Sequence, residues 1–279
     1  NSNGTVVVAV SGGPNNSNGG DAFGPIVAKH ILGRRGNQTV PVRASDVNSP
    51  FGLAAVGSTI QWLLSKPGVV LWGVGLISDA EFGGVAARLE IPGVRGPRSR
   101  DLLLLYRSLN PLPISDPALI AADVYPLDNL MQQQREVCFI IHGVDRADAF
   151  KVCPLCKEHL VNNYDRNMTN LFSNLKSCKR VISSSLHGII FSHSFGIPAL
   201  PVAVGKKITG GDFKYRDYMH SIGMTWFRSR TPIQNVLTQN LTLTDWSELV
   251  DQVPHPEFPI PTSHFYQTFP KLGVPGSLA

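Results

Sequence analysis

Two residues of the sequence have side chains and neighbours suited to chemistry on a small anion. His187 follows Ser183-Ser184-Ser185-Leu186 and precedes Gly188, where a strand pattern changes into a helix pattern. A histidine at such a turn titrates near neutral pH and can transfer protons, and the three hydroxyls could orient it or bind substrate oxygens. Arg95 lies in Val94-Arg95-Gly96-Pro97, at an expected strand end, and its planar fork suits a carboxylate or a phosphate. On these local patterns a structural histidine and a structural ion pair are the alternatives.

Further candidates follow two other expected strands. His142 ends the strand expected over 136–142, which would place it at the same edge of a sheet as His187. Lys206, Lys207, Lys214 and Arg216 form a basic region after the strand expected over 199–204. The alternatives are a capping or loop histidine and a solvated basic surface.

The segment 11–21 is rich in glycine and asparagine and precedes a helix expected over 22–33. Its backbone N–H groups and the helix dipole could hold an anion. It has neither the P-loop lysine nor the G-x-G-x-x-G spacing of dinucleotide-binding loops. Asp21 is well placed to cap the helix, and capping is at least as good an interpretation as substrate contact.

The cysteines allow three interpretations. Cys153 and Cys156 are separated by two residues, and His159 and Cys178 follow. This set could complete a tetrahedral zinc site, and the same spacing is typical of a dithiol redox pair. Because a second CxxC pair is missing, we rank reduced thiols ahead of both. Four cysteines in 279 residues are too few for a disulfide scaffold.

The elements that must position these residues alternate between strand and helix patterns. Continuous apolar runs predict buried strands at 5–10, 69–76, 136–143 and 199–204, and strands leading into turns or helices within 53–66, 92–106 and 179–188. Helical spacing predicts helices at 22–33, 167–178, 214–223 and 245–253, and another that opens at 187–195. Segment 114–126 looks irregular, and the proline-rich segment 253–265 is expected to be extended at the surface.

Strands that alternate with helices imply parallel sheets with helices on both faces. In such sheets ligands bind beyond the carboxyl ends of the strands. We therefore expect the site to be built from the loops 11–21, 73–79, 93–101 and 183–188.

Composition excludes several classes of protein. A hydrophobic fraction of 43%, a charged fraction of 16% and a mean hydropathy of +0.02 exclude a disordered chain. The apolar runs are far shorter than the roughly 20 residues of a membrane span. The net charge of +5 comes from scattered basic residues, which disfavours nucleic acid as a partner. The length suggests two domains, which we place at 1–131 and 132–279, with Gln132–Gln134 in the linker.

The sequence leaves the compartment open. The chain begins at Asn1 with no Met and no apolar leader, which indicates trimming. The expected free cysteines favour a cytoplasmic protein. The glycosylation sequons favour a secretory route, which would place the protein in the Golgi lumen if the natural chain has an N-terminal anchor. The sequons lie at Asn3, Asn15, Asn37, Asn167 and Asn240.

An ordered series of short motifs resembles the polysaccharide pyruvyltransferase family. Each motif is weak alone, and their order over about residues 18–224 makes the match specific. The motifs are Asn18-Gly19-Gly20-Asp21, Val56-Gly57-Ser58, Leu71-Trp72-Gly73-Val74-Gly75, Val94-Arg95-Gly96-Pro97, Ser115-Asp116-Pro117-Ala118, Ser185-Leu186-His187-Gly188 and Lys214-Tyr215-Arg216-Asp217-Tyr218.

The resemblance implies a GT-B-like α/β fold, in which two Rossmann-like domains face each other across a cleft. We expect the N-terminal domain to hold the acceptor and the C-terminal domain to hold phosphoenolpyruvate. The implied reaction transfers the enolpyruvyl group of phosphoenolpyruvate onto a sugar of a polysaccharide or glycan and gives a pyruvate ketal. The resemblance implies no metal and no cofactor beside this donor substrate.

The resemblance also assigns residues. His187 matches the catalytic histidine of the family, and Arg95 matches its phosphoenolpyruvate-binding arginine. Many members carry an arginine where this chain has Ser185, so Lys214 or Arg216 is expected to supply the second cation. The full set of expected substrate contacts is Asn18, Gly20, Asp21, Ser58, Gly75, His142, Ser185, Leu186, Lys214 and Arg216.

Two other functions fit the same fold. A GT-B glycosyltransferase would use a nucleotide sugar and would need a nucleotide pocket. A sugar-binding relative without catalytic activity is the other alternative, which the departure at Ser185 keeps open.

Overall fold

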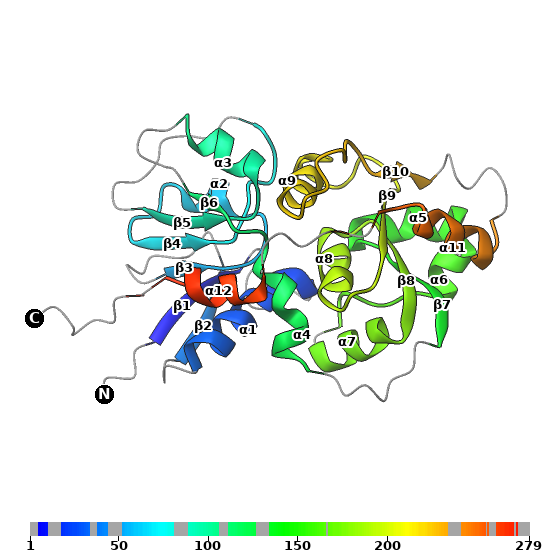
Figure 1. The fold of residues 1–279 in the computed structure, drawn as a ribbon, viewed down its shortest axis with the longest axis horizontal. Coiled ribbons are helices and arrows are strands. Elements are labelled where there is room, and N and C mark those ends of the chain that lie inside the picture. The colour runs from blue at the N-terminus through cyan, green and yellow to red at the C-terminus, as the bar shows by residue number, and fades with distance from the viewer. Residues whose placement is uncertain are drawn as a thin grey trace, which may run out of the picture.

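The computed structural model describes residues 5–10, 18–33, 38–43, 52–80, 89–105, 111–126, 134–165, 167–233, 241–254, 256, 261–270 and 272. Residues 11–17 of the expected glycine-rich loop, Gln132 and Gln133 of the expected linker, and the sequons at Asn3, Asn15, Asn37 and Asn240 lie outside this set. The described residues form two α/β domains, each built on its own parallel sheet (Figure 1). The expected fold of two Rossmann-like domains is confirmed.

The first domain contains a six-stranded sheet with the order β2-β1-β3-β4-β5-β6, and every pair of neighbours is parallel. Residues of the central strands β3 and β4 are buried, which explains their unbroken apolar sequence. The strands are β1 Thr5–Val10, β2 Gln38–Arg43, β3 Gly52–Ala54, β4 Val69–Trp72, β5 Glu90–Val94 and β6 Leu112–Pro113.

The second domain contains a four-stranded parallel sheet with the order β10-β9-β8-β7. Strand β8 pairs with a neighbour on each side, where Ile182 lies opposite Phe139 of β7 and opposite Leu200 of β9. The strands are β7 Arg135–Ile140, β8 Cys178–Ser183, β9 Ala199–Ala203 and β10 Thr231–Pro232.

Helices cover both sheets. In the first domain they are α1 Gly19–Gly33, α2 Ile60–Leu63 and α3 Pro97–Leu103, followed by the 3₁₀ turn η2 Pro117–Ile120 and α4 Ala121–Val124. In the second they are η3 Gly143–Asp145, α5 Arg146–Val152, α6 Pro154–Glu158, α7 Met168–Lys176, α8 Leu186–Ser194, α9 Phe213–Ser221 and α11 Leu243–Asp251, and α12 Thr262–Thr268 comes last. None of the described helices has the length and apolar character needed to cross a membrane.

A cluster of three aromatic rings joins the domains on one side. Phe23 of α1 meets Phe172 of α7 and Phe191 of α8 edge to face, with ring centroids 5.9 and 5.4 Å apart. All three rings are fully buried, and they belong to one hydrophobic core that contains residues of both domains. We call Phe23, Phe172 and Phe191 the aromatic cluster. Edge-to-face contacts add to the free energy that burial of these rings provides.

Three sequence expectations about local structure were wrong. Asp21 does not cap α1, because the helix begins two residues earlier, and the side-chain oxygen of Asn18 accepts from the N–H of Gly20 at 3.2 Å. Segment 114–126 contains the helical turns η2 and α4 rather than irregular chain. The described end of the proline-rich segment enters α12, where Phe265 is fully buried.

Helix α12 comes back to the first domain. Phe265 and Phe269 contact Trp72 of β4, with ring centroids 6.2 and 4.9 Å from the indole. Nε1 of Trp72 also donates to the Thr268 hydroxyl at 3.2 Å. The final described segment therefore packs on the first sheet, although it follows the second domain in sequence.

The expectation of reduced thiols was also wrong. All four cysteines are paired, as Cys138–Cys178 and Cys153–Cys156. The first bond links neighbouring strands β7 and β8, which explains why Cys178 is not available to a site at Cys153. Because both sulfurs of the CxxC pair are in a disulfide, the zinc interpretation of this set falls as well.

The two disulfides should stabilise the fold to different extents. Replacing Cys138 and Cys178 with alanine is expected to lower the free energy of unfolding by about 4 kcal/mol, since the bond spans 40 residues. The matched control removes Cys153 and Cys156, whose separation is 3, and should cost about 2 kcal/mol. Urea unfolding of both double variants measures the difference. Equal losses would contradict the dependence on loop length.

Candidate functional site

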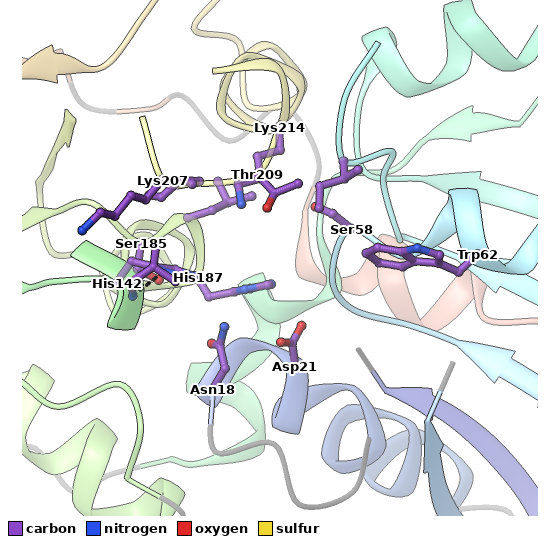
Figure 2. A pocket seen from close by; sticks show the side chains of 14 residues that line it. Asn18, Asp21, Ser58, Trp62, His142, Ser185, His187, Lys207, Thr209 and Lys214 are labelled. Carbon is purple, nitrogen blue, oxygen red and sulfur yellow. Dashed lines mark hydrogen bonds between the residues drawn. The ribbon is translucent and has the colours of Figure 1, made fainter. Parts of the chain in front are cut away.

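A pocket of about 170 Å³ lies between the two domains, beyond the carboxyl ends of both sheets (Figure 2). This is the position that parallel sheets predict for a ligand. Residues that follow β3, β4, β7, β8 and β9 all contribute to its walls. The lining consists of Asn18, Asp21, Ser58, Trp62, Ile77, His142, Val144, Ser185, Leu186, His187, Lys207, Ile208, Thr209 and Lys214.

His187 lies in the first turn of α8 beside a buried carboxylate. Its side chain extends toward the centre of the pocket (Figure 2), and only 8% of the residue is exposed. Its Nε2 is 3.8 Å from Oδ2 of Asp116, which is fully buried. Neither of these two atoms has a hydrogen-bond partner among the described residues. The carboxylate and the ring nitrogen therefore lie within range of a charge interaction, at a separation longer than a hydrogen bond.

The loop before η2 holds Asp116 in place. Oδ1 of Asp116 accepts from the N–H of Ala118 at 2.9 Å, which leaves Oδ2 directed at His187. The preceding residue, Ser115, has φ +69°, a conformation that residues other than glycine rarely adopt. Its hydroxyl lies 2.8 Å from that of Ser221 in α9. Backbone strain of this kind persists where the surroundings fix it, and it is common at functional sites.

Two glycines make room for the predicted site residues. A Cβ on Gly20 would lie 1.8 Å from Nδ1 of His187, so the imidazole packs directly on the backbone of α1. A Cβ on Gly75 would lie 2.2 Å from an Nη of Arg95. Neither glycine lines the pocket, and each acts through the side chain that it admits.

The serine loop is used internally. The Ser183 hydroxyl donates to the Ile140 carbonyl at 2.8 Å, and the Ser184 hydroxyl accepts from the N–H of His142 at 3.0 Å. The Ser185 hydroxyl caps α8. The three hydroxyls therefore fix the turn that presents His187. Of the three, only Ser185 lines the pocket.

Lys214 lines the pocket, and the pKa of its amine is strongly shifted. Burial lowers the pKa of its amine to about 8, and the nearby charges of Arg95 and Arg230 add to this effect. Asp21 and Asp145 oppose the shift. Lys214 forms no ion pair with another described residue. An anion in the pocket would therefore meet a positive charge that the protein leaves poorly compensated.

Lys207 also lines the pocket, but its charge is directed elsewhere. Its amine forms an ion pair with Asp148 at 2.6 Å, and Figure 2 shows the amine pointing away from the centre of the pocket. Both partners are about half exposed, so this pair is weak. Arg216, the other cation that the sequence offered, is not among the lining residues.

His142 is neutral at physiological pH. Burial lowers its pKa to about 4, and the charges of Lys214, His187, Arg146 and Arg230 contribute to the shift. Its Nδ1 accepts from the N–H of Val144 at 3.4 Å, which assigns the ring proton to Nε2. His142 can therefore donate one hydrogen bond into the pocket, but it is not a general acid.

Arg95 does not line the pocket. It is fully buried, and its Nε donates to Oδ2 of Asp217 at 3.1 Å. One Nη donates to the Ser58 hydroxyl at 2.7 Å and the other to the Leu76 carbonyl at 2.9 Å. Asp217 also accepts from the N–H and the hydroxyl of Ser99, at 2.9 and 2.7 Å. Because Asp217 is in α9, this ion pair is a second junction between the domains. Arg95 is also hydrogen-bonded to Ser58, which lines the pocket.

The structure thus brings together most of the residues that the sequence singled out. Eight line the pocket: Asn18, Asp21, Ser58, His142, Ser185, Leu186, His187 and Lys214. Gly20, Gly75, Arg95 and Arg216 do not, and a direct role for them in substrate binding stays a prediction.

The sequence reasoning did not assign Trp62, Val144, Ile208 or Thr209 to the site, and it included Ile77 only within the expected loop 73–79. It treated Lys207 as part of a basic region and quoted Asp116 only within a motif. Lys207, Ile208 and Thr209 follow β9, and a search of every loop at a carboxyl strand end would have found them. No group of three or more metal-ligating side chains occurs in the described part of the chain.

Comparison with solved structures identifies the fold class of this protein. A putative UDP-N-acetylglucosamine 2-epimerase from Listeria monocytogenes has a similar structure, with a TM-score of 0.56 at 9% identity, covering 96% of this chain and 94% of that chain. This likeness concerns the fold alone, which is a GT-B-like pair of Rossmann-like domains. A spinosyn rhamnosyltransferase complexed with thymidine diphosphate has a TM-score of 0.41 at 13% identity over 95% of both chains.

The family model for polysaccharide pyruvyl transferases matches residues 18–206. The chain belongs to this family, which indicates a transferase. An uncharacterized protein of Acanthamoeba polyphaga mimivirus is 27% identical over 245 residues, which cover 82% of this chain and 79% of that protein.

Proposed function

We propose that the protein transfers the enolpyruvyl group of phosphoenolpyruvate onto a sugar to form a pyruvate ketal. The observation that carries the proposal is the pairing of His187 with Asp116 in a pocket that also contains Lys214. Family membership supports the reaction class. Phosphoenolpyruvate carries a carboxylate and a phosphate, and its reaction requires a proton at C3, so a proton carrier beside a cation suits it.

His187 transfers protons in this mechanism. Its imidazole takes the proton of the attacking sugar hydroxyl and supplies a proton to C3, which turns the methylene carbon into a methyl group. The sugar oxygen bonds to C2, and the C2–O bond to phosphate breaks. A second sugar hydroxyl then bonds to C2 and loses its proton, which closes the ketal ring and leaves inorganic phosphate. The Asp116 carboxylate stabilises the imidazolium that forms in the first step.

The second domain supplies the charge that the donor needs. Lys214 lies on the wall of the pocket above His187 (Figure 2). The first turn of α8, at Leu186 and His187, also lines the pocket, so the positive end of this helix faces it. Both features stabilise the phosphate as negative charge develops on the leaving oxygen. Lys214 thus takes the place of the arginine that other members carry at Ser185.

Donor affinity should fall with rising pH because of Lys214. Below its pKa of about 8 the amine is charged and attracts the donor, and above this pH it becomes neutral. The Michaelis constant for phosphoenolpyruvate is therefore expected to rise by up to about tenfold per pH unit above pH 8. Initial rates between pH 6.5 and 9.5 measure this dependence.

The Lys214→Arg variant is the control for this titration. Arginine keeps its charge over the whole range, so its Michaelis constant should stay nearly flat with pH. Lys214→Met should show a raised constant that stays nearly flat with pH and that the wild type approaches above pH 8. Identical pH profiles for the wild type and Lys214→Arg would rule out Lys214 as the titrating group.

The reaction itself is tested with purified protein, phosphoenolpyruvate and galactose- or mannose-type acceptors. We expect phosphate release that depends on the acceptor, and a ketal product detected by mass spectrometry and by the methyl signal in NMR. Calorimetric titration with nucleotide sugars tests the glycosyltransferase alternative. Binding of a nucleotide sugar without binding of phosphoenolpyruvate would overturn the proposal. Sugar binding without turnover of either donor would favour a non-catalytic role.

A further inference from the structure

One wall of the pocket carries an exposed indole that the donor chemistry does not use. Trp62 of α2 lines the pocket and is 45% exposed, whereas the apolar side chains of Leu186 and Ile208 in the same lining are buried. In Figure 2 it lies on the side of the first domain, opposite Lys207, His142 and Ser185 of the second. An indole this exposed, directed at a pocket, is available to a ligand.

The backbone that carries Trp62 is tied down. The side-chain oxygen of the neighbouring Gln61 accepts from the N–H of Ile77 at 2.9 Å, and its nitrogen donates to the Ser78 carbonyl at 3.3 Å. These bonds join α2 to the loop after β4. The N–H of Trp62 donates to the Thr59 carbonyl at 3.1 Å. The indole is thus presented from a wall that two separate strand-end loops hold in place.

The two walls of the pocket differ in chemistry. The second domain contributes cations and the positive end of α8. The first contributes Trp62, the hydroxyl of Ser58, the amide of Asn18 and the carboxylate of Asp21. The carboxylate disfavours an anion on that side, whereas a carboxylate, an amide and a hydroxyl are suitable partners for sugar hydroxyls. A flat apolar surface edged by polar groups matches a pyranose, which has one face of C–H groups and a rim of hydroxyls.

We propose that Trp62 forms the acceptor subsite, where its indole packs against the C–H face of a neutral pyranose while Asp21 and Asn18 bind the hydroxyls. This inference rests on the proposed function for the assignment of the opposite wall to the donor. It places the acceptor on the first domain, with its reacting hydroxyls directed toward His187. It also names the substrate class as a neutral sugar ring.

Sugar binding without donor tests the subsite separately from turnover. Saturation-transfer NMR with methyl galactosides and methyl mannosides is measured on the wild type, Trp62→Ala and Trp62→Phe. The signals of the ring C–H protons are expected in the wild type, reduced in Trp62→Phe and absent in Trp62→Ala. Trp226→Ala is the matched control, because Trp226 is 50% exposed but lines a different pocket. It should behave as the wild type does.

Kinetics provide the second measurement. Trp62→Ala is expected to raise the Michaelis constant for the acceptor by about tenfold, as loss of one aromatic contact would, and to change the constant for phosphoenolpyruvate less than twofold. If Trp62→Ala loses the NMR signals but the wild type does not turn over phosphoenolpyruvate, the subsite stands and the proposed function is overturned. If the wild type turns over phosphoenolpyruvate but Trp62→Ala binds sugar as the wild type does, the proposed function stands and the subsite is overturned. Binding of a uridine nucleotide that requires Trp62 would overturn the subsite, since the indole would then stack on a base.

Discussion

Replacing His187 with alanine is expected to lower the rate of pyruvyl transfer by about 10²–10⁴-fold, the usual contribution of a positioned acid–base group. Among the described residues that line the pocket, neither His142 nor Lys214 is suited to take over. His142 has a pKa of about 4 and carries no proton to give as an acid near pH 7. Lys214 has a pKa of about 8 but occupies the anion side of the pocket. The measurement is phosphate release and ketal formation under saturating donor and acceptor.

Two companion variants separate chemistry from folding. His187→Gln keeps a polar side chain of similar size, so its urea midpoint should match that of the wild type while turnover stays low. Asp116→Asn keeps the size of the buried side chain but removes the charge beside Nε2 of His187. It should give an intermediate loss of turnover, since the imidazolium formed during proton transfer no longer has a carboxylate beside it. Turnover within a few-fold of the wild type in His187→Ala would exclude the assigned role.

Replacing Arg95 with methionine is expected to lower the free energy of unfolding by about 3–5 kcal/mol. The substitution leaves the Asp217 carboxylate buried without its cation, and an uncompensated buried charge is costly. It also removes the donors to the Ser58 hydroxyl and the Leu76 carbonyl. Urea unfolding gives the loss directly.

The double variant Arg95→Met/Asp217→Asn identifies the cause of that loss. It should be more stable than Arg95→Met alone, because the carboxylate no longer lacks a partner. The resemblance predicts a different role for Arg95, in which Arg95→Lys binds phosphoenolpyruvate more weakly because lysine lacks the planar fork. Arg95→Met with wild-type stability and a raised Michaelis constant for the donor would favour the ligand role over the structural one.

Local sequence features predicted many of the strands and helices that build the two parallel sheets. The apolar runs at 5–10, 136–143 and 199–204 became β1, β7 and β9, because strands buried on both faces need continuous apolar residues. The helix pattern of 22–33 became α1, which starts three residues earlier because Asn18 and not Asp21 provides the cap. His187 and His142 were predicted to face a ligand because both follow strands, and ligands of parallel sheets bind beyond the carboxyl ends of the strands.

Contacts between distant segments were not predictable. Arg95 and Asp217 are 122 residues apart, and nothing beside Arg95 in the sequence indicates a buried partner. Asp116 meets His187 only because η2 packs against α8. Cys138 pairs with Cys178 because β7 and β8 are neighbours in the sheet, which the spacing of the cysteines does not reveal. Sequence periodicity describes each element by itself, and tertiary packing then decides which side chains meet.

The aromatic cluster and the Arg95–Asp217 ion pair join the domains at two separate places, and the pocket lies between the same domains. Domains usually move relative to each other where their interface is small and polar, and a shared apolar core with a buried ion pair opposes such motion. The two walls are therefore preorganised at a fixed separation. We therefore expect a ligand that enters to lose little binding free energy to domain closure. Its association rate should then be set by diffusion into an open site and not by a conformational step.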